Sequence, residues 1–146
     1  MDAFAVMDPC SRLLGGYEIL CPPKSEIDYQ SAPRNALTFG WMGVDGVHHA
    51  ILKVGGIVRD DSPIVQVSPM DSDDVIVLAD SFLNYLADGS QVSTDEMLGV
   101  IDVERIGKQA LVPFLRDRFD VIRLLDEHRI EILNSRFGHL IERKNE

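Results

Sequence analysis

The stretch Ile64–Gly89, IVQVSPMDSDDVIVLADSFLNYLADG, decides the fold. It begins with the short apolar run Ile64–Val67, crosses a polar segment that contains Pro69, and resumes with the β-branched run Val75–Ala79. An unbroken apolar run of this length is typical of a strand that is covered on both faces. We therefore expect a strand, a loop of turn residues and a second, central strand of a sheet.

A short helix is expected directly after the second strand. Asp80 and Ser81 are good helix-capping residues, and the apolar side chains that follow recur at positions i, i+1 and i+4, which places them on one face: Phe82, Leu83 and Leu86. Gly89 stands where a helix commonly ends. The stretch thus predicts two strands followed by a capped helix.

A hairpin is predicted upstream of this stretch. Alternating residues lead into Asp45-Gly46, a pair that favours a type I′ turn, and Val47–Lys53 returns. With a two-residue loop, Trp41 pairs with Ala50. One face then carries Leu37, Phe39, Trp41, His48, Ala50 and Leu52, and the other carries Met42, Val47, His49 and Ile51. Gly55-Gly56 predicts a further turn, with Ile57–Arg59 as the start of a short strand.

The two ends of the chain are less regular. Residues 1–35 give no assignable pattern, although Pro22-Pro23 is expected to end any element before it and residues 24–35 to form a loop. In the C-terminal part, a capping box at Ser93–Glu96 and the segment Val103–Val112 predict helices. Apolar residues continue at helical spacing to Leu133, while the alternation in Arg129–Ile132 leaves a strand as the alternative.

Composition indicates one soluble globular domain, residues 1–146. Apolar residues make up 45% and charged residues 26%, and the mean hydropathy is zero. No apolar run approaches the roughly 20 residues that span a bilayer. The first ten residues, MDAFAVMDPC, carry no basic residue and so do not form a secretory signal. We expect a cytoplasmic protein in which Cys10 and Cys21 are free thiols rather than a disulfide.

The charge of the chain excludes two classes of partner. The net charge is −10, and residues 1–103 hold 16 acidic and 5 basic side chains, a net of −11. Nucleic acids and anionic membranes both require a basic surface, so neither is expected as a partner. An acidic surface is compatible with a basic protein partner, although acidity also serves solubility alone.

The sequence offers no catalytic constellation. It has no HExxH, GxSxG, P-loop or Gly-rich nucleotide motif. His48 and His49 are adjacent on a predicted strand and so point to opposite faces, while His128 and His139 are expected at the surface. The segment Asp71–Asp74 has oxygen ligands at a calcium-like spacing but lacks the Gly and the final Glu of an EF-hand, which favours a solvated turn. We therefore expect no enzymatic activity, no metal and no cofactor.

The stretch Ala36–Gly89 resembles the SUKH superfamily, which includes the yeast cell-wall-synthesis regulator and many bacterial toxin-immunity proteins. The residues Leu37-Thr38-Phe39 through Val44-Asp45-Gly46-Val47-His48 are similar to the hairpin that opens the family's sheet. The two strands around an Asp-rich loop, followed by Asp80-Ser81-Phe82-Leu83-Asn84-Tyr85-Leu86, are similar to the family's "sSFxxFL" ending. The family's usual N-terminal helix and LP stretch have no clear counterpart in residues 1–35, and residues 93–146 extend beyond the match.

The resemblance implies an α+β fold with a mostly antiparallel, curved sheet flanked by helices, no enzymatic activity and a surface cleft for a protein partner. For a bacterial member it implies an immunity protein that binds and neutralises a toxin, often a nuclease. Because binding surfaces are usually built on loops, the expected contacts with a basic toxin domain are the loop carboxylates Asp60, Asp61, Asp71, Asp73 and Asp74. The alternative is a small enzyme or a ligand-binding domain with a pocket on the Trp41/His48 face. The sequence leaves open whether the protein forms a homo-oligomer.

Overall fold

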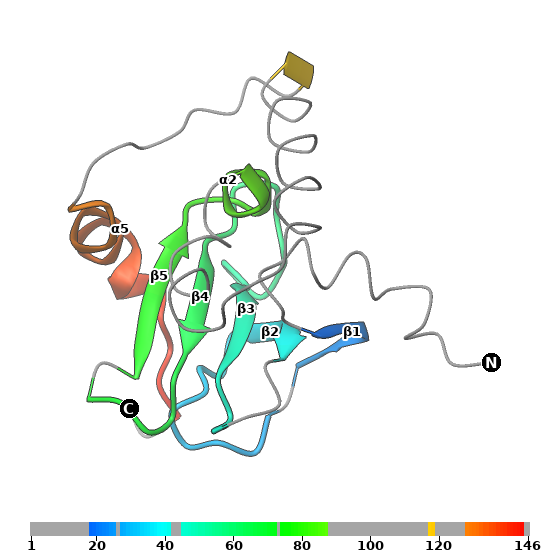
Figure 1. Cartoon of the computed structure of the whole chain (residues 1–146), viewed down its shortest axis with the longest axis vertical. Helices are drawn as coiled ribbons and strands as arrows, with labels where there is room; N and C mark the ends of the chain where they lie inside the picture. Colours follow the sequence, from blue (N-terminus) through cyan, green and yellow to red (C-terminus); the bar gives the residue numbers. More distant parts are fainter. Residues whose placement is uncertain are drawn as a thin grey trace, which may run out of the picture.

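One five-stranded antiparallel sheet organises the protein, with strands in the order β1-β2-β3-β4-β5. A computed structural model describes residues 18–25, 27–41, 45–72, 74–87, 117–118 and 128–144 (Figure 1). The strands are β1 (Glu18–Lys24), β2 (Ala36–Trp41), β3 (His48–Leu52), β4 (Ile64–Val67) and β5 (Val75–Ala79). Helices flank this curved sheet, so the expected α+β class is confirmed. Within the described residues no helix combines the length and apolarity needed to cross a membrane.

The strands β4 and β5 match the two apolar runs residue for residue, but β5 is an edge strand and not a central one. Its outer edge is covered by α5 (Arg129–Phe137), which lies beside it in Figure 1. Asn134 on this helix accepts a hydrogen bond from the free backbone N–H of Val77, at 3.1 Å. The apolar run therefore reflects a strand covered on both faces and capped at its edge by a helix.

The helix after β5 forms as expected. It is α2 (Phe82–Ala87), and Ser81 caps it by accepting a hydrogen bond from the Asn84 backbone N–H at 3.2 Å. The Asn84 side chain donates in turn to the Asp80 carboxylate. Tyr85 is completely buried and fixes the helix on the sheet. The expected C-cap at Gly89 and the helices expected within residues 93–112 lie outside the described residues.

The C-terminal segment is helical, which settles the alternative between helix and strand. In α5 and the short 3-10 helix η2 (Gly138–Leu140), Ile130, Leu133 and Phe137 pack against the sheet while Ile132 is exposed. This spacing of three and four residues belongs to one helical face. His128 and His139 are exposed, as predicted.

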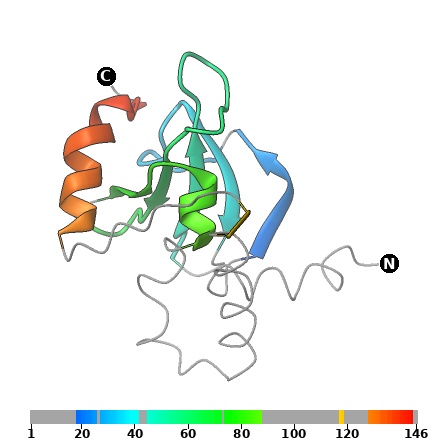
Figure 2. The ribbon, with the colours of Figure 1, turned by 90° about the horizontal axis from the view of Figure 1, so that it is seen from above.

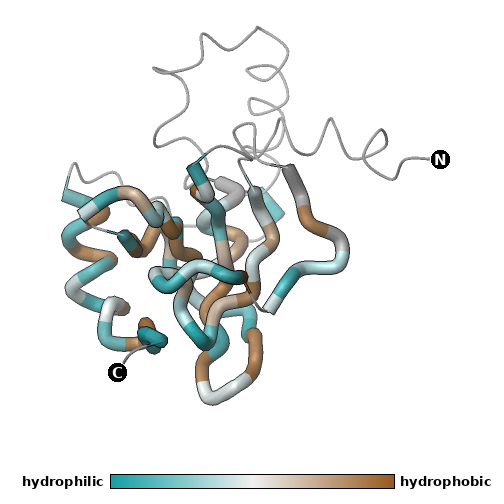
Figure 3. Tube along the Cα trace, turned by 90° about the horizontal axis from the view of Figure 1, so that it is seen from below, coloured by the Kyte–Doolittle hydropathy of each residue, from teal (hydrophilic) through white to brown (hydrophobic). Residues whose placement is uncertain are grey.

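Two apolar clusters cover the two faces of the sheet. The first, on what we call the tail face, contains Ala36, Ala50, Leu52, Val65, Val67, Val75, Val77 and Leu133, with Phe137, Leu140 and Ile141 packed against it. The second, on the α2 face, contains Phe39, Ile64, Leu78, Ala79 and Tyr85, with Ile51, Ile76 and Ile130 packed against it. Figure 3 shows brown, apolar stretches alternating with teal, polar ones along the trace.

The hairpin turns at Asp45-Gly46, as predicted, with φ of 54° and 73° at the two residues. The predicted register is wrong by two residues, because Trp41 lies opposite His48. A β-bulge between Thr38 and Gly40 interrupts the alternation of β2.

This bulge changes which side chains share a face. The predicted grouping is correct for Trp41, His48, Ala50 and Leu52 and for the opposite pair His49 and Ile51. It is wrong for Leu37, which pairs with Ile51, and for Phe39, which packs on Tyr85. Met42 lies outside the described residues, and Val47 precedes β3.

The N-terminal strand was not predicted. Pro22-Pro23 lies inside β1 and does not end it, because β1 is an edge strand, where a missing N–H donor costs little. A register shift lies between Ile19 and Lys24, around these prolines. The described residues that follow, 25 and 27–35, form a loop as expected. Cys10 lies outside the described residues, so the expectation of free thiols stays a prediction.

The C-terminal tail is fastened to this loop through one buried side chain, Asn35. Its amide nitrogen donates to the carbonyl oxygens of Leu140 (2.9 Å) and Lys53 (3.0 Å), and its oxygen accepts from the Glu142 backbone N–H at 3.1 Å. The Arg34 backbone N–H donates to the Glu142 carbonyl at 2.8 Å. Segments about a hundred residues apart are thereby joined across the tail face.

Candidate functional site

The predicted contact carboxylates do not form one cluster. Asp60 and Asp61 lie in the β3–β4 loop (residues 53–63), whereas Asp71 and Asp74 lie in the β4–β5 loop (residues 68–74). These loops leave opposite ends of β4 and so stand at opposite ends of the sheet. Asp73 lies outside the described residues. The structure therefore presents two separate acidic positions.

Asp74 is already paired within the protein. Nη1 of Arg143 lies 2.9 Å from both carboxylate oxygens of Asp74, and the two side chains are 43% and 24% exposed. The carbonyl of Asp74 also accepts from the Ser68 backbone N–H at 2.7 Å, which closes the β4–β5 loop. This carboxylate holds the tail against the loop.

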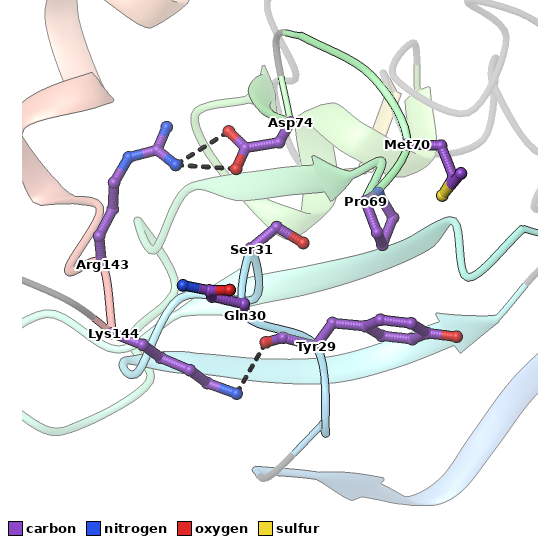
Figure 4. A pocket seen from close by; sticks show the side chains of 8 residues that line it. All are labelled: Tyr29, Gln30, Ser31, Pro69, Met70, Asp74, Arg143 and Lys144. Carbon is purple, nitrogen blue, oxygen red and sulfur yellow. Dashed lines mark hydrogen bonds and ion pairs between the residues drawn. The ribbon is translucent and has the colours of Figure 1, made fainter.

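A partly open pocket of about 570 Å³ lies beside this ion pair (Figure 4). Its lining residues are Tyr29, Gln30, Ser31, Pro69, Met70, Asp74, Arg143 and Lys144. The ammonium of Lys144 donates to the carbonyl oxygens of Ile27 (2.7 Å) and Tyr29 (2.8 Å), so both cations of the pocket hold the tail in place. Ser31 Oγ is buried and has no hydrogen-bond partner among the described residues.

Three nearly parallel rings adjoin the pocket, because one of them, Tyr29, also lines it. The ring of Tyr29 lies 6.1 Å from that of Trp41 and 6.2 Å from that of His48, and Trp41 and His48 are 5.5 Å apart. Gly46 passes so close to Tyr29 that a Cβ at this position would stand 2.6 Å from the ring carbon Cζ. We call this group of Tyr29, Gly46, Asp74, Arg143 and Lys144 the anchored end of the sheet.

His48 is held neutral by its surroundings. Its Nδ1 lies 2.7 Å from the Gly46 carbonyl, which can only accept, so Nδ1 carries the proton. Nε2 is then an acceptor, and it has no partner in the described part of the chain. Burial lowers the pKa of His48, the bond to Gly46 opposes this shift and the charge of Lys144 adds to it.

His49 occupies the opposite, α2 face and belongs to a buried polar network. Its Nδ1 lies 2.7 Å from the Tyr85 hydroxyl and its Nε2 lies 3.2 Å from the Gln66 side-chain oxygen. Gln66 donates in turn to Ser68 Oγ at 3.1 Å. Burial lowers the pKa of His49 to about 4, although the bond to Gln66 acts in the other direction. These bonds explain the burial of a polar side chain without a catalytic role.

The β3–β4 loop differs from the anchored end because its residues 55–61 face solvent. Its backbone is fixed by an isolated bridge between Val54 and Ile57 around the Gly55-Gly56 turn. Ser62 holds the other end, because its Oγ accepts from the Arg59 backbone N–H at 2.8 Å. Residues 55–61 are nevertheless all exposed, and Figure 2 shows the loop projecting away from α2.

This loop combines apolar and acidic side chains at the surface. Ile57 is 55% exposed and Val58 is 43% exposed, and the carboxylates of Asp60 and Asp61 follow directly. Neither carboxylate takes part in any ion pair between the described residues. The expected short strand at Ile57–Arg59 is reduced to the single bridge at Ile57.

Sequence reasoning identified the acidic residues but missed their surroundings. The sequence predicts the start of a strand at Ile57–Arg59, whereas the position of Ile57 and Val58 between Gly55-Gly56 and Asp60-Asp61 is typical of a loop. No local pattern indicated that Arg143 would meet Asp74, which is 69 residues away. No group of three or more metal-binding side chains occurs within the described residues.

Comparison with known proteins finds no relative. No protein-family model matches the chain, and neither the curated proteins nor the solved structures contain a significant match. Any function must therefore be argued from the residues and their geometry.

Proposed function

We propose that this protein is a non-enzymatic module that binds a basic protein, acting as a cytoplasmic bacterial immunity protein that neutralises a toxin domain. The resemblance to the SUKH superfamily suggests this role, and nucleic acid and membrane are not proposed as partners. The net charge of −10 supports a basic partner, because opposite charges accelerate encounter and disfavour wrong partners.

The observation that carries the proposal is the exposure of unpaired carboxylates on fixed loops. Asp60, Asp61 and Asp71 are exposed, and the described residues form no ion pair with them. The backbone of their loops is hydrogen-bonded at Ser62 and at Ser68, where Asp71 donates its N–H at 3.0 Å. Carboxylates on a rigid loop lose little conformational freedom when they meet a partner's cations.

A ligand-binding domain is the second candidate, because the pocket lies beside the ring stack and contains the unpartnered hydroxyl of Ser31. Ligand sites usually enclose most of their ligand and present free polar groups. This pocket is partly open to solvent, and Arg143 and Lys144 are bonded to the protein's own oxygens. The geometry therefore supports protein binding better.

The proposal predicts that a toxin-like domain is encoded beside this protein, and the direct test is coexpression of the two. We expect the full chain to restore growth of cells that express this domain, and to bind it with an association rate that falls as salt is added. An unrelated acidic protein of similar net charge is the control for charge alone. A neighbouring region without a toxin-like protein, or a toxin domain that the full chain neither binds nor neutralises, would contradict the proposal.

A further inference from the structure

The β3–β4 loop carries features that the general proposal does not use. Ile57 and Val58 expose two adjacent β-branched side chains. The loop that carries them projects from the sheet (Figure 2). Single exposed apolar residues are common, but a fixed loop that presents two of them beside two carboxylates resembles the centre and rim of a protein interface.

We infer that the β3–β4 loop is the docking element of the protein: Ile57 and Val58 enter an apolar recess of the partner, and Asp60 and Asp61 face basic side chains around that recess. This inference rests on the proposed function and assigns its contact surface. The partner is thus a protein with a shallow apolar depression bordered by lysine or arginine.

The loop is organised before it binds. Gly55 and Gly56 have φ of 64° and 82°, values that side-chain-bearing residues rarely adopt, and they turn the chain between Val54 and Ile57. Pro63 and Ser62 are buried and fix the return to β4. A tip whose backbone is already ordered loses less entropy on docking, so its two apolar side chains can contribute more to affinity.

The loop carries two carboxylates, Asp60 and Asp61, and two cations, Lys53 at its start and Arg59 beside the carboxylates. Arg59 is the exposed cation next to the carboxylates, and its guanidinium lies over the turn, with Nη2 4.0 Å from the position of a Cβ on Gly55. Asp60 and Asp61 remain outside any ion pair within the described residues. At the anchored end, by contrast, the carboxylate of Asp74 is bonded to Arg143. Docking at the loop therefore requires no ion pair between the described residues to break.

Binding kinetics of variants test this assignment, with the neighbouring toxin-like domain as the probe. The double variant I57S/V58S should weaken binding about tenfold or more, mainly through faster dissociation, because it removes the buried centre of the interface. D60N/D61N should slow association several-fold, and this effect should shrink as salt is raised.

Two matched controls separate the loop from general surface effects. Ile132 on α5 is 41% exposed, close to the 43% of Val58, so I132S removes a similar apolar side chain elsewhere. D28N removes an exposed carboxylate outside the β3–β4 loop and outside the predicted contacts. Both should change the dissociation constant by less than about twofold, within the usual effect of surface substitutions. Thermal unfolding should show that every variant keeps the parent's fold. V58K is a second variant of the loop: its long charged side chain should prevent entry into the partner's apolar recess without altering the loop backbone.

The outcomes distinguish this inference from the proposed function. If the parent does not bind the toxin domain, the proposed function fails and the docking element fails with it. If the parent binds and I57S/V58S and V58K bind equally well, the proposed function stands and the docking assignment is wrong. Loss of binding in the loop variants alone supports both.

Discussion

The two ends of the sheet use the same kind of residue for different purposes. At the anchored end, Asp74 is bonded to Arg143, Lys144 holds two carbonyl oxygens and Tyr29 covers the turn at Gly46. In the β3–β4 loop, Asp60 and Asp61 are exposed beside Ile57 and Val58. At the anchored end, the charged side chains are thus bonded within the protein and hold the tail. In the loop, the carboxylates and the apolar side chains remain accessible to a partner.

This difference shows that a count of loop carboxylates does not identify an interface. All five predicted aspartates occur in turn-rich segments, yet the structure pairs Asp74 and exposes Asp60, Asp61 and Asp71. What decides the role of each carboxylate is whether a distant cation reaches it. For Asp74 that cation comes from the C-terminal tail.

Acidification should cause the largest loss of stability. The responsible group, His49, lies in the sheet and not in the β3–β4 loop. The pKa of His49 is lowered to about 4, whereas the unfolded chain protonates histidine near 6.5, so between these values only the unfolded state binds the proton. Stability should therefore be complete above about pH 6.5 and fall by about 3 kcal/mol as the pH drops to 4. The lowered pKa of His48 acts in the same direction.

Urea unfolding across this pH range measures the effect. H49Q keeps a hydrogen-bonding side chain at this position and should flatten the pH dependence, and H139Q, which alters an exposed histidine, is the matched control. A parent protein with equal stability at pH 7 and pH 4.5 would contradict the buried, neutral state of His49.

Glycine substitutions should separate the two ends most clearly. Gly46→Ala forces a side chain into a positive-φ position and against Tyr29, so we expect a loss of about 2 to 3 kcal/mol. Gly56→Ala also forces a side-chain-bearing residue into a positive φ, here 82°, but no described atom lies within 4 Å of the new Cβ. We therefore expect a loss of stability of only about 1 kcal/mol. Chemical unfolding of both variants checks this, and equal losses would show that Tyr29 does not press on the turn.

Removing single carboxylates should have smaller, unequal effects. Asp74→Asn weakens the partly exposed pair with Arg143 and should cost about 1 kcal/mol, reduced by added salt. Asp60→Asn should change stability by less than about 0.5 kcal/mol, because no described cation pairs with it. Unfolding at low and high salt measures both. If the two substitutions had the same effect, the tail would not be held by Asp74.

Local sequence signals predicted the parts of this fold whose partners are close in the chain. The runs Ile64–Val67 and Val75–Ala79, the cap at Ser81 and the turn at Asp45-Gly46 all depend on neighbouring residues, and each is present. The position of β5 at the edge was not predictable from the run itself, because Asn134 and α5 provide its cover from 57 residues away. A bulge shifts a register without a distinctive composition, so the face of Phe39 was assigned wrongly.

For the candidate site, too, the sequence predicted only part of the arrangement. The acidic residues were identified from composition and turn chemistry, whereas their pairing depends on where Arg143 and Lys144 finish in the fold. The exposure of Ile57 and Val58 is likewise a property of the finished loop, because both residues are more often buried in a strand. Which carboxylates are accessible could therefore be learned only from the tertiary structure.

Hydrogen exchange of the full chain, measured with and without the neighbouring toxin-like domain, tests the central claim most directly. The account predicts that the backbone amides of residues 55–61 gain protection in the complex while those of residues 68–72 at the anchored end do not. Protection confined to the anchored end, or no change anywhere at concentrations that form the complex, would contradict it.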